Sequence, residues 1–355
     1  MRILKKLLTV FATLWGVATV IFFLFSVMPG DPAQMMLGQN ENSEELVLIQ
    51  KKYGFDQPIF KQYTSYLNDL CLISWHPKVG SFNSLDTGNY HYTSLFDFQS
   101  KALVIKWPYL RESYQKNDMG VSQIIADTLP NTVVLAIAAL FIAIILGLLL
   151  GVLSAIRVNT WLDRLIQWVS TIGMSTPSFF SAILAAWIFG FLLQSYTGLN
   201  MTGSLYELDD MGTSYHIAWK NLILPSLVLG IRPLAVVTQL MRNALLDEWS
   251  RDYVRTARSK GLTEAQVLWR HVVKNALNPV VTALSGWFAS MLAGAVFVEY
   301  IFGWNGIGKE IVNALNVLDV PVLMGSVLTV SSLFILINLL VDQIYIYLDP
   351  KIKST

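Results

Sequence analysis

Charged residues are scarce in this chain. Asp, Glu, Lys and Arg make up 14% of its 355 residues, whereas soluble domains carry about 25%. Apolar residues make up 54% and the mean hydropathy is +0.50, so the deficit indicates lipid rather than water around much of the chain. The net charge of +1 gives no overall field that would favour an acidic partner. We therefore expect no binding to nucleic acid.

Cysteine and histidine are also rare. Cys71 is the single cysteine, which excludes an intramolecular disulfide and any metal site built on paired cysteines. His76, His91, His216 and His271 are scattered without metal-ligand spacing, and no serine, histidine and acid stand in a catalytic arrangement. We expect no metal, no cofactor and no enzyme active site.

Six apolar stretches are long enough to cross a bilayer, which takes roughly 20 residues of helix. They are Leu7–Met28, Asn131–Ile156, Leu165–Gln194, Trp219–Met241, Val280–Ile301 and Val322–Leu348. The first stretch follows basic residues, as a secretory signal would. Its apolar run is longer than the usual 7–15 residues, and no small-residue cleavage site precedes Pro29. We expect it to be retained as a membrane span.

The distribution of Lys and Arg predicts the orientation, because short cytoplasmic loops are enriched in these residues. With the N-terminus inside, the two short outer loops hold only Lys220 and Lys309. The inner segments then hold Arg2, Lys5, Lys6, Arg157, Arg164, Arg242, Arg251, Arg255, Arg258, Lys260, Arg270, Lys274, Lys351 and Lys353. Both termini are therefore expected in the cytoplasm.

These spans divide the chain into four regions. We expect residues 1–29 to form the first span, 30–130 an external cap, 131–348 a five-helix core and 349–355 a cytoplasmic tail. Within the cap, periodicity predicts helices at Ser43–Lys52 and Ile59–Leu72. An insert at about 72–109 is rich in Asn, Ser, Tyr and Gly, and we expect an irregular loop or a pair of strands there.

A polar segment at 247–278 separates the fourth span from the fifth. Arg251, Arg255 and Arg258 fall on one helical face, and Gly261 is suited to end that helix. A second helix with a Thr cap is expected after it. A short helix with a glycine stop is typical of a docking element. The alternative is an ordinary basic loop that contacts lipid headgroups.

Several short sequences in the chain match one known family. The segment 253–262, followed by His271 and Asn278-Pro279, closely resembles the EAA loop of ABC importer permeases, in the dipeptide, oligopeptide and nickel branch. Further matches are Met28-Pro29-Gly30-Asp31-Pro32, Tyr53-Gly54-Phe55-Asp56, Leu129-Pro130-Asn131-Thr132, Gly294-Ala295-Val296-Phe297-Val298-Glu299, Trp304-Asn305-Gly306-Ile307-Gly308 and Asp349-Pro350-Lys351-Ile352.

The resemblance implies an all-α inner-membrane protein with the six-helix fold of type I importers and an external cap between helices one and two. It implies coupling to a cytoplasmic ATPase through Tyr253, Arg255, Thr256, Ala257, Arg258, Lys260 and Gly261. The implied partners are a second homologous permease, two ATPase subunits or domains that bind the ATP, and an external substrate-binding protein. Three departures from the general pattern are Arg255 for a glutamate, Lys274 for a proline, and the cap insert; the branch shares the first two.

The sequence Gly303-Trp304-Asn305-Gly306-Ile307-Gly308-Lys309 has the spacing of a phosphate-binding loop. The residue that follows is Glu310, whereas magnesium binding needs Ser or Thr there, and no buried strand precedes the loop. The predicted topology also places it outside the cell. We interpret it as a glycine-rich external turn, without ATP hydrolysis by this chain.

Ionisable residues within membrane spans are candidates for function. They are Arg232 in the fourth span, Glu299 near the outer end of the fifth and Asp342 in the sixth. Arg232 and Glu299 are candidates for a pathway or partner contact, against the alternative of snorkelling or an internal pair. Pro177 is expected to kink the third span, which would shape such a pathway.

The leading hypothesis is a permease subunit that forms half of a pathway and is driven by partner ATPases. An ion-coupled secondary transporter is the alternative, but inverted repeats and midplane coupling groups are not evident in the sequence. A membrane enzyme would need paired catalytic groups. Within the resembling branch peptides are the commonest substrates, and the sequence leaves peptides and nickel complexes both open.

Overall fold

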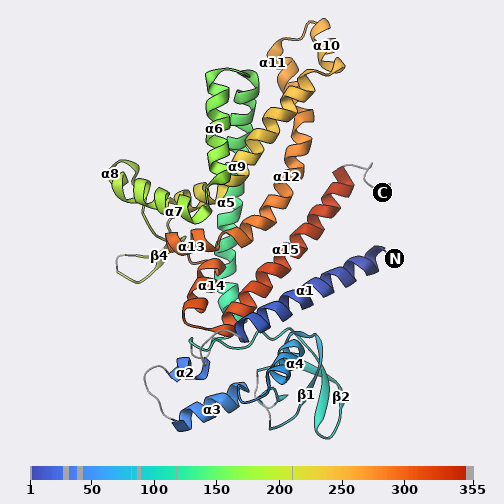
Figure 1. Cartoon of the computed structure of the whole chain (residues 1–355), viewed down its shortest axis with the longest axis vertical. Helices are drawn as coiled ribbons and strands as arrows, with labels where there is room; N and C mark the ends of the chain where they lie inside the picture. Colours follow the sequence, from blue (N-terminus) through green and yellow to red (C-terminus); the bar gives the residue numbers. More distant parts are fainter. Residues whose placement is uncertain are drawn as a thin grey trace. The chain divides into compact units, whose positions relative to one another are not determined.

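The computed structural model describes residues 2–26, 32–37, 43–80, 82–85, 89–116, 119–209 and 211–348. Two of the matched patches, at 28–32 and 349–352, lie wholly or mostly outside these residues, as does the expected tail at 349–355. The chain divides into two compact units (Figure 1). The outer unit comprises residues 1–128 and 310–332, and the core unit comprises 129–309 and 333–355.

Long apolar helices supply the membrane spans of the described chain. Four are long and apolar enough by themselves: α1 (Arg2–Ser26), α5 (Val121–Ile156), α9 (Lys220–Trp249) and α15 (Val320–Leu348). Two bent pairs pass the same test together, Trp161–Ser175 with Ser178–Leu192 and Glu264–Val281 with Gly286–Gly294. Taken as one span each, they bring the number to the six that the sequence predicts.

The third span is sharply broken at the expected proline. Helix α6 (Trp161–Ser175) and the following helix meet at 110°. Thr176 has an extended backbone with ψ of 131°, which is the conformation favoured before proline. Pro177 also has no N–H for a helical bond. The chain continues as α7 (Ser178–Ala185), the π-helix η2 (Ala186–Leu192) and α8 (Gln194–Thr197), so the expected kink is confirmed and is large.

Helix α5 begins ten residues before the expected start of the second span. It runs from Val121 to Ile156 with Pro130 inside it, so the end of the expected cap region is helical. A proline within a membrane helix is tolerated when neighbouring groups satisfy the freed backbone atoms.

The cap combines short helices with a small sheet. Its helices are α2 (Pro32–Leu37), α3 (Ser43–Tyr53) and α4 (Ile59–Leu70), and the latter two confirm the sequence-based predictions. The insert forms three strands, β1 (Ile73–Pro77), β2 (Tyr92–Asp97) and β3 (Lys101–Lys106). They pair antiparallel in the order β1-β3-β2, which is one strand more than the expected pair.

A buried carboxylate ties the sheet of the cap to helix α4. Asp69 accepts hydrogen bonds from the Tyr90 hydroxyl at 2.9 Å and from Arg111 Nε at 2.9 Å. Lys106 on β3 donates to the backbone oxygen of Asp69. Because a buried charge is costly unless it is paired, these bonds explain how Asp69 lies inside the cap.

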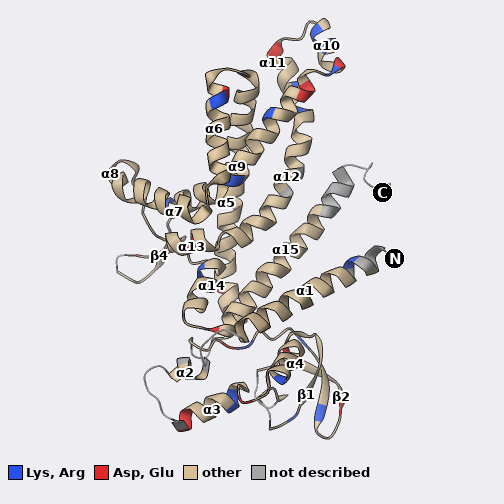
Figure 2. Cartoon of the chain, viewed as in Figure 1, with Lys and Arg blue, Asp and Glu red and all other residues tan. Residues whose placement is uncertain are grey.

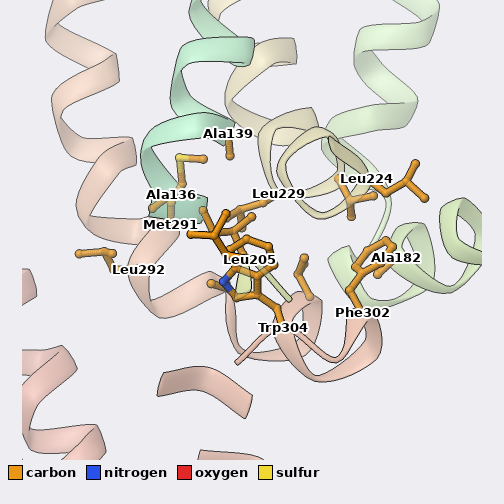
Figure 3. Close-up of a cluster of buried hydrophobic side chains, with 14 of the residues drawn as sticks. Ala136, Ala139, Ala182, Leu205, Leu224, Leu229, Met291, Leu292, Phe302 and Trp304 are labelled. Carbon is orange, nitrogen blue, oxygen red and sulfur yellow. The ribbon is translucent and has the colours of Figure 1, made fainter. Parts of the chain in front are cut away.

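In the core unit, α9 packs against α6, α7 and α12 (Val273–Gly294). A buried apolar cluster includes Trp304, which is fully buried, together with Phe302 and Leu205 (Figure 3). The remaining elements are β4 (Tyr206–Leu208) paired with β5 (Tyr215–Ile217), α10 (Asp252–Ser259), α11 (Glu264–Val267), η3 (Leu268–Val272), α13 (Val296–Phe302) and α14 (Ile307–Asn316).

Candidate functional site: the helix pair between α9 and α12

Helix α10 is short and its end is fixed by glycine. Gly261 has φ of +80°, a conformation that costs most residues strain. The Leu262 N–H bonds to Ala257 O at 3.4 Å and the Gly261 N–H bonds to Arg258 O at 2.9 Å. This pair of bonds is the Schellman arrangement that ends helices, and it confirms the predicted stop. We call residues 252–261 the knob.

A second cap begins the next helix two residues later. The Thr263 side chain accepts a bond from the Gln266 N–H, and the Gln266 side chain accepts one from the Thr263 N–H. This reciprocal capping box fixes the start of α11 and confirms the predicted Thr cap. The chain then passes through η3 into α12. Both ends of the turn between α10 and α11 are therefore held by local bonds.

An apolar cluster anchors the knob to the helices that carry it. Val254 is fully buried and Ala257 is 6% exposed. They share this cluster with Leu245 of α9, Val267 of α11 and Val272 of η3. Buried apolar contacts of this kind hold an element in one orientation, so the knob is a rigid extension of α9 and α12.

The predicted docking residues divide between two faces of α10. Arg255 is 78% exposed in its side chain, and the exposed residues beside it are Thr256, Arg258, Ser259 and Lys260. Tyr253 is half-buried and its hydroxyl bonds to Glu248 Oε2 at 2.5 Å. Ala257 faces inward. A bulky side chain at Ala257 would therefore disrupt the internal cluster before it touched any partner.

Charge gathers on the exposed face of the knob. Arg258 forms a two-pronged ion pair with Glu264, with Nε–Oε1 at 2.9 Å and Nη2–Oε2 at 3.1 Å. Arg251 lies 4.0 Å from Glu248. Figure 2 shows both basic and acidic residues around α10, α11 and the adjoining end of α9. The face can bind a surface that offers carboxylates and a fitting cleft.

A buried ion pair that the sequence did not predict braces the same end of the core unit. Arg242 of α9 donates to both oxygens of Asp163 in α6, each at 2.8 Å. Ser154 Oγ donates to Asp163 Oδ1 at 2.5 Å. Thr160 caps α6 by accepting from the Asp163 N–H. The spacing of Thr160 and Asp163 is a local signal for a helix start. Arg242, the partner of Asp163 on α9, lies 79 residues later in the chain, so no local signal marks the pair.

Arg232 lines a small pocket beside the break in the third span. The pocket has a volume of about 70 Å³. Arg232 Nη2 lies 3.5 Å from Thr176 O, next to Pro177 at the bend. The opposite wall includes Ser290 and Trp287 of α12. An exposed arginine within a span needs a polar surrounding, and this pocket supplies one between α6, α9 and α12.

Glu299 is held inside the glycine-rich turn. It is fully buried, and its Oε2 accepts from the N–H groups of Gly308 at 2.7 Å and Lys309 at 3.2 Å, at the start of α14. A Cβ on Gly306 would overlap this carboxylate. The turn with phosphate-loop spacing thus binds a carboxyl group of its own chain, at a helix N-terminus whose N–H groups have no partner within the helix.

Two of the sequence patches that carried the family resemblance contact each other across this turn. Trp304 Nε1 donates to Asn131 O at 3.0 Å, and Asn131 Nδ2 donates to Asn305 O at 2.8 Å. The Ile307 N–H donates to Thr132 Oγ1 at 2.9 Å. The turn is therefore fastened to α5, more than 170 residues earlier in the chain.

Comparison with known proteins agrees with this arrangement. Residues 143–354 match the family described as "Binding-protein-dependent transport system inner membrane component". Residues 1–136 match the N-terminal family of the same systems, so the boundary between the two falls within α5.

Curated relatives match almost the whole chain. It is 32% identical to the dipeptide transport system permease protein DppB of Alkalihalophilus pseudofirmus, over 99% of this chain and 98% of that protein. It is 31% identical to the glutathione transport system permease protein GsiC of Salmonella typhimurium, over the same shares of the two chains.

A solved structure supports the fold. A chain of the MetNI methionine ABC transporter in an inward-facing conformation is 16% identical with a TM-score of 0.50, covering 63% of this chain and 95% of that one. The chain thus shares its fold with a chain of a known ABC transporter over 63% of its length, and the family matches cover both units of the chain. The chain belongs to the family of binding-protein-dependent transport system inner membrane components.

Proposed function

We propose that this protein is the permease subunit of an ATP-driven importer for short peptides, coupled to its ATPases by the knob. The observation that carries the proposal is the rigid, basic helix α10, fixed by Gly261 and by the cluster around Val254. Such an element transmits movement because it cannot turn independently of α9 and α12. Relatives that transport dipeptides and glutathione support the substrate class.

The nucleotide is bound by the partner ATPases. In this chain Glu299 fills the loop with phosphate-loop spacing. Its side chain accepts hydrogen bonds from the backbone N–H groups of Gly308 and Lys309, which a phosphate would need. Those two amides are therefore not available to a phosphate. The chain therefore acts as a permease without an ATPase site and without a cofactor of its own.

The complete transporter contains two permeases. An ATPase moves a permease only through different affinities for its two conformations, and the knob is the contact at which ATP binding produces that difference. Arg232 and the pocket beside the bend lie on the pathway or face the second, homologous permease. Two ATPase subunits or domains and an external binding protein complete the assembly, with both termini of this chain in the cytoplasm.

The experiment is reconstitution into liposomes with the proteins encoded beside this gene. ATP-dependent uptake of a labelled dipeptide, requiring the binding protein and both permeases, is the expected result. Uptake driven by a proton gradient without ATP would refute the ATPase-driven function. Uptake with this permease as the only permease type would refute the requirement for a second, homologous permease.

Thr256→Trp tests the knob itself. Thr256 is exposed and its hydroxyl bonds only within its helix, to Asp252 O at 3.1 Å. The bulky side chain is expected to block ATPase docking and abolish uptake while the permease stays folded in the membrane. Glu264→Gln, which weakens an exposed ion pair at the edge of the knob, is the matched control and is expected to retain most uptake because exposed pairs contribute little.

A further inference from the structure

The outer unit contains a cavity that the transport function does not use. Its volume is about 330 Å³, within the range of small-molecule sites. It lies between the C-terminal end of α1, the start of α15, and the cap around α4. All of its lining residues belong to the outer unit.

One wall of the cavity is polar and includes an unmatched hydrogen-bond donor. Tyr66 is 4% exposed, and its hydroxyl has no partner among the described residues. Burial raises the pKa of Tyr66 well above its usual value, so the hydroxyl remains protonated and able to donate. An unmatched buried polar group is costly, and a bound acceptor would remove that cost.

A guanidinium group lies over the ring of Tyr66. Arg111 also lines the cavity, and its Cζ is 5.7 Å from the centre of the Tyr66 ring. Arg111 is paired with Asp69, at 2.9 Å from Nη2 to Oδ2. Arg111 is the one charged side chain among the described residues that line the cavity, which favours an anionic ligand.

The other wall is apolar and comes from membrane spans. Phe22 and Phe25 are in the last turns of α1, and Val320 and Met324 are in the first turns of α15. The cavity thus lies where two spans meet the cap. Phospholipid headgroups lie at this level of a membrane, with their acyl chains beside the spans.

We propose that this cavity binds an anionic glycerophospholipid, with the phosphate at Tyr66 and Arg111 and an acyl chain along Phe22 and Met324. The arrangement of donors and apolar surface matches both halves of such a molecule. A free inorganic anion would leave the apolar wall without a partner. The bound lipid would join α1, α15 and the cap at their common junction.

The test uses the full-length permease in a mild detergent, stripped of lipid and titrated with phosphatidylglycerol under native mass spectrometry. Tyr66→Phe removes only the unmatched hydroxyl and is expected to weaken lipid binding roughly tenfold, the effect of one strong hydrogen bond. Tyr63→Phe is the matched control: it lies on the same helix, its hydroxyl bonds to Thr19 Oγ1 at 2.7 Å, and it does not line the cavity. Its lipid affinity should equal that of the natural protein.

Thermal unfolding separates binding from folding. Without lipid, Tyr66→Phe should unfold at the same temperature as the natural protein or higher. Phosphatidylglycerol should raise the unfolding temperature of the natural protein more than that of Tyr66→Phe. Ser26→Trp, at a position that lines the cavity, should abolish the lipid effect by filling part of the cavity. Equal lipid affinity for the natural protein and Tyr66→Phe would overturn the proposal. So would stabilisation by inorganic phosphate alone, by neutral phosphatidylcholine to the same degree, or by a dipeptide in place of lipid.

Discussion

At the scale of single residues, the pair between Asp163 and Arg242 shows how a buried charge holds two spans together. The carboxylate receives two bonds from the guanidinium and one from Ser154. Breaking a fully buried pair costs about 3–5 kcal/mol, and the cost here is smaller because the Arg242 side chain is 18% exposed. We expect Asp163→Asn to lower the unfolding temperature of the purified permease clearly. Arg164→Ala, an exposed position one residue later, should change stability by no more than about 0.5 kcal/mol. Equal effects of the two changes would show that the pair is not buried in the folded protein.

Gly306 gives a second prediction at this scale. A methyl group there would overlap the Glu299 carboxylate, so Gly306→Ala should force the glycine-rich turn open and cost about 1–3 kcal/mol. Gly286→Ala is the control because its Cβ would meet no atom within 4 Å, and it lies inside α12, where alanine is the better helix former. Thermal unfolding of the two variants should move in opposite directions. A stable Gly306→Ala protein would mean that Glu299 does not occupy the turn.

At the scale of elements, the helix stop of the knob can be tested by its backbone. Gly261 has open space around its Cβ position, so Gly261→Ala costs only the strain of a positive φ, about 1 kcal/mol. Hydrogen exchange of the α10 amides should be roughly fivefold faster in this variant. Lys260→Ala, at the C-cap position with a negative φ of −82°, should leave the exchange unchanged. If the two variants exchange alike, the Schellman stop does not limit the opening of α10.

The sheet of the cap carries a titratable group that predicts a pH dependence. His76 is fully buried, with Nδ1 2.8 Å from Asn83 O and its ring 4.5 Å from that of Tyr90. Burial, assisted by the charge of Lys106, lowers the pKa of His76 below its usual value, and the bond to Asn83 only partly offsets this. The folded cap therefore resists a proton that the unfolded chain accepts. Its stability should be complete above about pH 6.5 and fall as the pH drops below that value.

Thermal unfolding of the permease at about pH 7.5 and about pH 5.5 checks this dependence. His76→Gln should remove part of the loss at the lower pH, because glutamine takes up no proton. The exposed His91 provides the control, and His91→Gln should retain the loss of the natural protein. If His76→Gln keeps the full loss, the acid sensitivity of the cap comes from another group.

Local signals in the sequence predicted the elements better than they predicted the contacts between them. The Gly261 stop, the Thr263 cap and the break at Pro177 each depend on a few neighbouring residues, and all three are present in the structure. The inward face of Ala257 was not evident, because Val267 and Val272 cover it from the next helix. The bond from Arg242 to Asp163 spans 79 residues, and only the packing of α9 on α6 brings the two together.

The same limit applies to the glycine-rich turn. Its spacing suggested a phosphate loop, and the following Glu310 argued against one. That Glu299 fills the turn follows only from the fold of α13 and α14 around it. The sequence of the cap insert did not decide between a loop and strands. Strand β2 pairs with β3 across a register shift between Ser94 and Phe96, and such a shift weakens the alternation of side chains that marks a strand.

At the scale of the whole molecule, we propose the knob as the point where a partner ATPase acts on the permease. Its rigidity comes from within the chain and its exposed charge is available to another protein. The described residues place Thr256 on the exposed face of α10, and Trp161 at the exposed start of α6 in the same core unit. These two positions can be compared within one protein because the chain's only cysteine, Cys71, can be replaced by serine.

The most direct measurement is crosslinking from a single introduced cysteine to lysines of the ATPase in the assembled transporter. Thr256→Cys, in a Cys71→Ser background, should form a crosslink with the ATPase through a short thiol-to-amine reagent, and the yield should change when ATP is added. Trp161→Cys should give little or no ATPase crosslink in the same membranes. A stronger crosslink from Trp161→Cys, or none from Thr256→Cys in a transporter that is active, would contradict the assignment of the knob as the coupling element.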